Sequence, residues 1–288
     1  MSTAAALLAE GTAALRAAGI SQPRSEARLL LEEATGLDRV ALATAPARRI
    51  EAAAADAYRT LVRRRAAREP MAYLLGRAEF WSLDFAIEPG VLVPRADTET
   101  LIEAAVRAFP DRDLPLRVLD LGVGSGCLLL TLLHRYPNAR GIGTDTSAVA
   151  LRLARRNAAR LGLAGRAALV ATCWAEGVAG PFDLVVANPP YIPSAAIDAL
   201  QPEVSRFEPR TALDGGPDGL DAYRAILPEL PRLLAPGGLA LIELGRGQHA
   251  ELVPMAGALG LSVALHRDLA GIVRCLELRL PDRGRSTC

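Results

Sequence analysis

The tetrapeptide Asn188-Pro189-Pro190-Tyr191 combines residue types that can hold a planar amide or amino group. It follows the apolar run 182–187, so we expect it at the exit of a buried strand. An amide nitrogen delocalises its lone pair and attacks a methyl group poorly unless acceptors hold both N–H bonds. The Asn188 side-chain carbonyl and the Pro189 backbone carbonyl can supply these acceptors, and the Tyr191 ring can confine the group. The motif predicts methyl transfer to nitrogen, although alone it could equally be an ordinary turn.

A glycine-rich loop ends a second apolar run, at residues 117–126 (RVLDLGVGSG), and leads into an apolar helix predicted over 127–136. Alternating glycines permit a tight turn and a close approach of the backbone to a ligand. A dinucleotide-binding fingerprint would require glycine where Cys127 stands, and no Lys-Ser or Lys-Thr pair follows to hold a phosphate. The loop therefore favours a cofactor without phosphate groups.

Asp145 ends the next predicted strand, about two dozen residues after the first glycine, where a ribose-binding acid is expected. Its carboxylate can accept hydrogen bonds from both ribose hydroxyls. Taken together, the glycine loop, Asp145 and the tetrapeptide describe a nucleoside-bearing cofactor beside an amide-type acceptor. This combination suits S-adenosylmethionine.

Composition excludes several other classes of protein. The chain of 288 residues has 33 basic and 32 acidic side chains, a net charge of +1 that gives no global attraction to nucleic acid or an anionic membrane. The N-terminus lacks the basic segment of a signal peptide and carries Glu10, and no uncharged apolar run is long enough to span a bilayer. We expect a cytoplasmic protein. The four cysteines and three histidines are scattered without metal-ligand spacing, which predicts no metal.

The first part of the chain, residues 1–78, shows only helical periodicity and predicts a small helical domain. Breaks are expected at 19–23, after which Ser25 could cap the next helix, and around Pro46. The arginines of this region are expected on a solvated helix face, with an acidic or RNA-bearing partner as the alternative. These arginines are Arg59, Arg63, Arg64, Arg65 and Arg68.

Residues 79–96 predict a β-hairpin linker, with a turn at Pro89-Gly90 between the segments 79–88 and 91–94. From residue 97 to 288, strands and helices alternate. Strands are predicted near 117–121, 139–144, 167–171, 182–187, 238–244, 261–266 and 272–280. The last two are too close for a helical crossover and should pair antiparallel. The expected fold is α/β, a Rossmann-like sheet of seven strands.

The motifs and their order closely resemble the peptide-chain release factor glutamine methyltransferases, the PrmC or HemK family. The resemblance runs over essentially the whole chain, including the helical N-terminal domain. Its motifs are Phe80-Trp81-Ser82, Pro94-Arg95-Ala96-Asp97-Thr98-Glu99, the glycine loop, Asp145, Trp174, the tetrapeptide 188–191, Arg206-Phe207-Glu208-Pro209 and Pro236-Gly237-Gly238.

This resemblance implies a class I S-adenosylmethionine-dependent methyltransferase whose N-terminal helical domain recognises the substrate. The enzyme would methylate the side-chain nitrogen of the glutamine in the Gly-Gly-Gln loop of bacterial class I release factors and leave S-adenosylhomocysteine. Its expected partner is a release factor, with no direct nucleic acid and with a monomeric enzyme. The implied cofactor-binding residues are Gly122, Val123, Gly124, Ser125 and Gly126 for the methionine end, Asp145 for the ribose, Trp174 for the adenine and Asn188.

By the same resemblance, Asn188, Pro189, Pro190 and Tyr191 would bind the substrate glutamine, with Asn188, Pro189 and Tyr191 as catalytic residues. Arg95, Thr98 and Glu99 would line the site.

Three positions depart from the family pattern. Cys173 stands where an acidic residue commonly accepts a hydrogen bond from adenine, a contact worth about 0.5–1.5 kcal/mol. Ala96 replaces a proline and Val123 a hydroxyl residue. Two alternatives stay open: methylation of an adenine exocyclic amine in DNA or RNA, which the tetrapeptide suits equally well, and a non-catalytic protein-binding relative.

Overall fold

The computed structural model describes residues 2–281, and the chain forms two compact units. One unit comprises the chain up to Arg77 together with the distant segment Gln201–Phe207. The other comprises Ala78–Leu200 and the chain from Glu208 onward. The domain bounds predicted from the sequence did not assign residues 201–207 to the helical unit.

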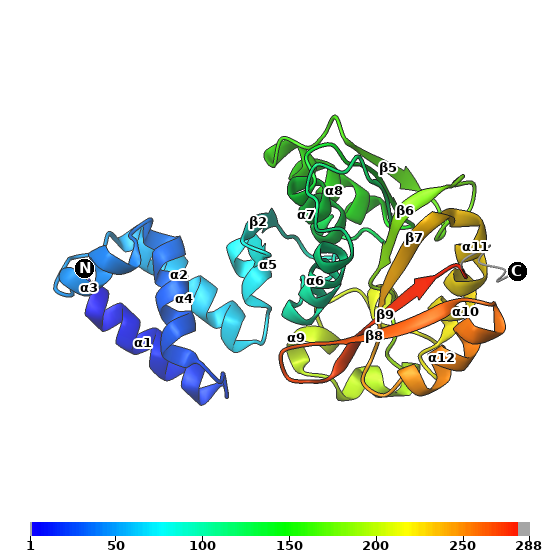
Figure 1. Cartoon of the computed structure of the whole chain (residues 1–288). Helices are drawn as coiled ribbons and strands as arrows, with labels where there is room; N and C mark the ends of the chain where they lie inside the picture. Colours follow the sequence, from blue (N-terminus) through cyan, green and yellow to red (C-terminus); the bar gives the residue numbers. More distant parts are fainter. Residues whose placement is uncertain (1, 282–288) are drawn as a thin grey trace, which may run out of the picture. The chain divides into compact units, whose positions relative to one another are not determined.

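The first unit is a bundle of short helices (Figure 1). Its helices are α1 (Ala4–Ala17), α2 (Pro23–Thr35), α3 (Arg39–Thr44), α4 (Ala52–Ala66), α5 (Met71–Leu75) and, from the distant segment, α9 (Pro202–Ser205). They enclose an apolar core around Leu7, Leu15, Leu30, Leu31 and Tyr58, all fully buried. Burial of this apolar face, more than helix propensity, stabilises such short helices.

The start of α2 differs from the prediction. Ser25 lies inside the helix and does not cap it, because the helix already begins at Pro23. Proline suits the first helical position, since its fixed φ is helical and its missing N–H would have no partner there. Gln22 precedes it without a side-chain capping bond.

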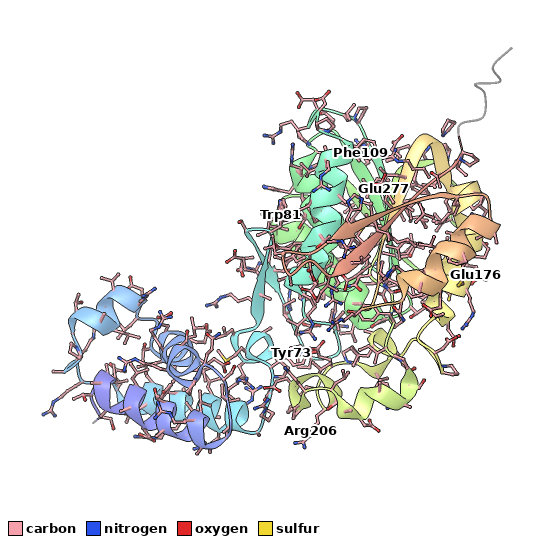
Figure 2. The ribbon with its side chains drawn as sticks, turned by 60° about the horizontal axis from the view of Figure 1, so that its bottom comes forward. Tyr73, Trp81, Phe109, Glu176, Arg206 and Glu277 are labelled. Carbon is pink, nitrogen blue, oxygen red and sulfur yellow. The ribbon has the colours of Figure 1, made fainter. Side chains whose placement is uncertain are left out.

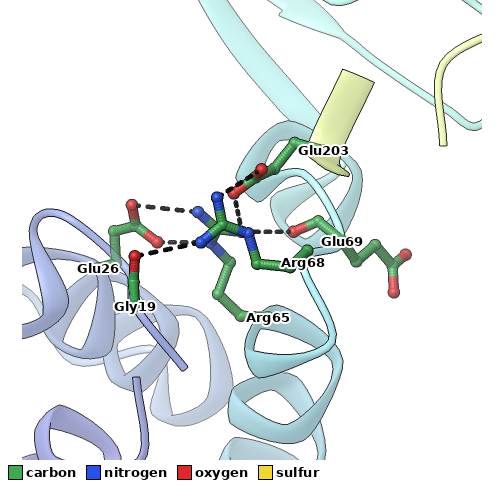
Figure 3. Close-up of polar contacts among 6 residues, drawn as sticks. All are labelled: Gly19, Glu26, Arg65, Arg68, Glu69 and Glu203. Atoms are coloured by element: carbon green, nitrogen blue, oxygen red, sulfur yellow. Dashed lines mark hydrogen bonds and ion pairs between the residues drawn. The ribbon is translucent and has the colours of Figure 1, made fainter. Parts of the chain in front are cut away.

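Arg64, Arg65 and Arg68, in and just after α4, pair with carboxylates of this unit. Arg65 is only 6% exposed, and it donates from Nε to Glu26 Oε2 at 2.5 Å and from Nη1 to Glu203 Oε1 at 2.9 Å (Figure 3). Arg68 donates to the other Glu203 oxygen at 2.8 Å, and Arg64 pairs with Glu69. The expectation of a solvated face is wrong for Arg65. Glu203 thereby ties α9 to the helical unit.

The hairpin of the linker also differs from the prediction. Its strands are β1 (Arg77–Phe80) and β2 (Leu83–Ala86), so the turn is Trp81-Ser82, at the tip labelled in Figure 2. Both turn residues have positive φ, 51° and 60°, the conformation of a two-residue turn that matches the twist of paired strands. Pro89-Gly90 instead begins a loop, and residues 91–94 form no strand.

The second unit contains the predicted seven-stranded sheet, in the order β5-β4-β3-β6-β7-β9-β8. The strands are β3 (Arg117–Leu121), β4 (Arg140–Asp145), β5 (Ala167–Ala171), β6 (Phe182–Ala187), β7 (Leu234–Glu243), β8 (Ser262–Arg267) and β9 (Val273–Arg279). All neighbours pair parallel except β9, which runs antiparallel to both β7 and β8. The Rossmann-like fold and the terminal reversal are confirmed.

Helices cover this sheet in two groups (Figure 1). The first group is α6 (Glu99–Ala108), α7 (Cys127–Arg135) and α8 (Ala148–Arg160), and the second is α10 (Asp221–Ile226), α11 (Leu230–Leu233) and α12 (His249–Ala258). Short 3₁₀ turns complete the unit, at Ala96–Thr98, Ser194–Ala199, Arg210–Ala212 and Leu227–Glu229. The order reverses at β3, with β4 on one side and β6 on the other, which is where ligands bind in open α/β sheets.

Candidate active site

The sheet register brings three predicted site residues to one edge. Leu121 of β3 pairs with both Thr144 of β4 and Ala187 of β6. β3, β4 and β6 run in the same direction, so the residues next after Leu121, Thr144 and Ala187 lie side by side. These residues are Gly122, Asp145 and Asn188.

A cavity of about 270 Å³ opens at this edge. Among the predicted residues, those that line it are Gly122, Val123, Gly124, Ser125, Asp145, Trp174, Asn188 and Pro190, together with Arg95 and Thr98. Gly126, Glu99, Pro189 and Tyr191 are not among its lining residues. The lining also includes Gly90–Leu92 and, from the chain after Glu208, Pro209, Thr211 and Ala212. Sequence reasoning missed the first of these loops because it assigned residues 91–94 to a strand, and it named Pro209 only as part of the motif 206–209 without placing it in the site.

The glycines of the loop have distinct roles. Gly122 and Gly124 have φ of 79° and 54°, the left-handed region where a side chain is strained. A Cβ on Gly126 would meet Leu130 Cδ1 at 2.8 Å, so this glycine allows close packing where α7 begins. Val123 is buried, and it packs where Gly143 of β4 leaves room for it. The loop thus exposes its first residues to the cavity and packs its last glycine.

Asp145 is fixed by two backbone donors. Its Oδ2 accepts from the Gly124 N–H at 3.0 Å and its Oδ1 from the Ser147 N–H at 2.8 Å. Each carboxylate oxygen retains a lone pair for a further donor. The carboxylate can therefore bind a pair of adjacent hydroxyls without moving.

Asp120 is a site residue that sequence reasoning missed. It lines the cavity at the end of β3 and is 1% exposed, and its Oδ2 accepts from the Leu129 N–H at 3.1 Å. Within residues 2–281, its Oδ1 has no hydrogen-bond partner. Burial raises the pKa of Asp120 to about 7, opposed by the Leu129 hydrogen bond and reinforced by Asp145. A buried acid with a free oxygen suits a cationic ligand group such as an ammonium.

Trp174 and Cys173 line the same cavity as Asp145. Trp174 has a φ of 45°, and its ring lies against Gly122, since a Cβ there would be 3.5 Å from Trp174 Cζ3. This leaves a flat indole surface in the cavity. The Cys173 thiol beside it is exposed, and a thiol is a weak hydrogen-bond acceptor.

The tetrapeptide contributes Asn188 and Pro190 to the cavity lining. Asn188 donates from Nδ2 to Thr98 Oγ1 at 3.0 Å, which leaves its side-chain oxygen as an available acceptor in the cavity lining. Pro189 is buried between two lining residues. The Tyr191 hydroxyl donates to Glu243 Oε1 at 3.3 Å. Asn188 therefore supplies the acceptor chemistry on the cavity side, and Tyr191 is held from the core side.

Arg95 fixes the loop that enters the cavity. Its Nη2 lies 2.6 Å from Glu208 Oε1, and the Glu208 side chain is almost wholly buried. Burial raises the pKa of Glu208, and Arg95 counteracts this by favouring the charged form. Glu99, by contrast, accepts from the Trp81 backbone N–H at 2.7 Å and supports the hairpin.

Residues 2–281 contain neither a candidate metal centre nor a candidate membrane-spanning helix. No group of three or more His, Cys, Asp or Glu side chains lies where it could hold a metal ion. No helix there has the length and apolar character needed to cross a membrane.

Comparison with known proteins extends these observations. Residues 6–76 match the family model of the PrmC N-terminal domain, and residues 96–201 match that of the methyltransferase small domain. The chain is 46% identical to the release factor glutamine methyltransferase of Rhodospirillum rubrum, covering 95% of this chain and 84% of that protein. It is 46% identical to the enzyme of the same name from Bradyrhizobium diazoefficiens, covering 93% and 91%.

Among solved structures, the hMettl16 catalytic domain in complex with the MAT2A 3'UTR hairpin 1 gives a TM-score of 0.56. It is 14% identical, over 77% of this chain and 82% of that one, a likeness of fold. With the two sequence relatives covering nearly the whole chain, the protein belongs to the release factor glutamine methyltransferase family.

Proposed function

We propose that this protein methylates the side-chain amide nitrogen of the glutamine in the Gly-Gly-Gln motif of bacterial class I release factors. The donor is S-adenosylmethionine, and the helical unit recognises the release factor. Family membership supports this substrate class. The observation that carries the chemistry is the Asn188 amide, whose NH₂ group is engaged by Thr98 so that its oxygen is left for a substrate donor.

The lining residues fit the proposed cofactor. Asp120 suits the ammonium of its methionine part, Asp145 its two ribose hydroxyls and the Trp174 indole its adenine. When bound, the cofactor would supply a sulfonium methyl group for attack by the amide nitrogen, with S-adenosylhomocysteine leaving as a neutral thioether.

The acceptor residues prepare the glutamine for this displacement. The Asn188 side-chain oxygen and the Pro189 backbone carbonyl each accept a hydrogen bond from one N–H group of the glutamine amide. These two hydrogen bonds fix the plane of the amide. Positive charge grows on the nitrogen as the new C–N bond forms, and both oxygens stabilise it. The alkylated nitrogen then loses one proton to water, so the site needs no strong base. The Tyr191 ring restricts the amide from the side.

Mass spectrometry of a release factor tests this function. After incubation with the protein and S-adenosylmethionine, we expect the mass of one methyl group on the peptide containing Gly-Gly-Gln. A release factor with that glutamine changed to alanine is the control and should stay unmodified. Filter binding with tritiated cofactor should label release factor and leave DNA and RNA unlabelled; label in nucleic acid alone would refute the proposal.

We also propose that the enzyme acts in the cytoplasm as a monomer, where release factors act. Sedimentation velocity should give a single species with the mass of one chain, 30.4 kDa.

A further inference from the structure

A buried carboxylate adjoins the acceptor end of the cavity without lining it. Glu243, the last residue of β7, is 1% exposed. Its Oε1 accepts from the Tyr191 hydroxyl at 3.3 Å, and its Oε2 is buried without a hydrogen-bond partner among residues 2–281. The Thr98 hydroxyl favours the charged form of this carboxyl group. The proposed mechanism assigns Glu243 no role. A buried charge is nevertheless costly unless hydrogen-bond donors or an opposite charge lie beside it.

Thr98 connects Glu243 with Asn188. The Thr98 hydroxyl is 1% exposed and accepts from Asn188 Nδ2 at 3.0 Å. A hydroxyl carries a single proton, and an ionised carboxylate can only accept. Because a Thr98 lone pair already serves Asn188, the Thr98 proton is left for Glu243, whose Oε2 lacks a donor within the described part of the chain. This order of donors requires Asn188 to turn its NH₂ toward Thr98 and to leave its oxygen for the substrate.

We propose that Glu243 is a positioning residue for methyl transfer, which sets the orientation of the Asn188 amide through Thr98 and holds the Tyr191 ring by its hydroxyl. The inference deepens the proposed function and rests on it. If the Asn188 amide were inverted, it would present a donor to the substrate NH₂, which is itself a donor. Two donors repel each other, so the orientation of the Asn188 amide should affect turnover while the shape of the cavity stays the same.

The protonation of Glu243 should control this orientation. Burial raises the pKa of Glu243 to about 7, while Thr98, Arg274 and Tyr191 favour its charged form. A protonated Glu243 can donate to Thr98, which frees the Asn188 amide to invert. Turnover should therefore fall as the pH decreases through about 7. The titratable or charged groups that act on Glu243 or feel its charge are Asp97, Cys127, Tyr191, Tyr223, Arg274 and Cys275.

Glu243→Gln is the direct test. It keeps the size of the side chain and removes its charge, so we expect kcat on a release factor to fall roughly 10- to 100-fold, as for a lost hydrogen bond to a charged group. KM for the release factor and the calorimetric affinity for S-adenosylmethionine should change little. The low-pH decrease of kcat seen with the wild type should be absent. Unchanged kcat and an unchanged pH profile would overturn the proposal.

Thermal unfolding separates positioning from a structural role. Because the folded state raises the pKa of Glu243, protonation stabilises the protein at low pH, and this contribution is lost as the pH rises through about 7. At pH 8, Glu243→Gln should therefore unfold at a temperature no lower than the wild type while turning over more slowly. A loss of both stability and turnover would indicate a structural role and count against positioning.

Further variants complete the design. Thr98→Val removes the connecting hydroxyl with little change of shape and should lower kcat as Glu243→Gln does, whereas Thr98→Ser should restore most of it. The matched control is Glu277→Gln on neighbouring β9, a half-buried glutamate that pairs with His266 and Arg279 (Figure 2). This control should keep its kcat. Full turnover by Thr98→Val would contradict the proposal even if the wild type methylates release factors; failure of the wild type would refute the proposed function instead.

Discussion

Asp145 ends β4 and Asn188 follows β6, the two strands that flank β3, yet their mutations should have opposite effects on cofactor binding and turnover. Asn188→Ala removes an acceptor used as charge grows on the substrate nitrogen, so kcat should fall roughly 10²- to 10³-fold with little change in cofactor affinity. Asp145→Ala should chiefly weaken cofactor binding, because the lost acceptors serve the ground state. Calorimetry and single-turnover kinetics measure both effects; lost cofactor affinity with normal turnover in Asn188→Ala would refute its assignment.

Cys173 offers a gain-of-affinity prediction. It lies in the cavity beside Trp174 and is exposed, so a larger polar side chain fits there without disturbing the core. Cys173→Glu supplies an acceptor for the adenine amino group, a hydrogen bond of about 0.5–1.5 kcal/mol. Cofactor affinity measured by calorimetry should rise about two- to tenfold. Cys173→Ala should leave the affinity near that of the wild type; equal affinity for all three proteins would exclude this contact.

At this scale the sequence predicted much of the site. Gly122, Asp145 and Asn188 follow apolar runs, and parallel strands necessarily bring such residues together. The roles of Asp120 and Glu243 were not predictable. Both resemble ordinary strand residues, and their importance depends on burial and on which of their oxygens lack or have partners.

At the scale of elements, the β1–β2 turn predicts a stability change. Ser82 has a φ of 60°, where a Cβ costs about 1–2 kcal/mol relative to glycine. Ser82→Gly should therefore raise the unfolding temperature by a few degrees in differential scanning calorimetry. Ser25→Gly is the matched control, because Ser25 lies inside α2 in the right-handed region and glycine there should cost about 1 kcal/mol. Destabilisation by both variants would show that the Ser82 side chain contributes more than its strain costs.

The strands were well predicted and the hairpin was not, for a physical reason. Central strands such as β3 and β6 are short, mostly apolar runs whose residues are almost all buried, and burial on both faces enforces that pattern. The hairpin turn consists of Trp81 and Ser82, which lack the Asn-Gly signal of such turns, whereas Pro89-Gly90 has a turn composition and forms a cavity loop. Local composition thus misplaced the turn.

At the scale of the whole molecule, Glu203 should matter more than its sequence surroundings indicate. It shares two arginines, and Arg65 has a side-chain exposure of only 7%. Glu203→Ala leaves that guanidinium with Glu26 as its carboxylate partner, and breaking such a buried pair costs about 3–5 kcal/mol. Hydrogen exchange along α4 should accelerate markedly. Arg64→Ala breaks the more exposed pair with Glu69 and should cost under about 1 kcal/mol; equal effects would place Arg65 and Glu203 in the same class as surface pairs.

No sequence pattern could have predicted this pairing. Residues 65 and 203 lie 138 positions apart, and a short segment with proline at its start reads as a loop of the catalytic unit. The helical unit nevertheless includes residues 201–207, which follow the tetrapeptide 188–191 in the sequence.

This discontinuity restricts how the protein can be re-engineered. A chimera that takes residues 1–77 from a relative would replace Arg65 and Arg68, the two arginines that pair with Glu203, and leave Glu203 in place. Grafts should be exchanged as a pair, the N-terminal fragment together with its counterpart of 201–207. Libraries that shuffle at a single crossover after residue 77 should accordingly yield fewer folded clones than libraries with three crossovers.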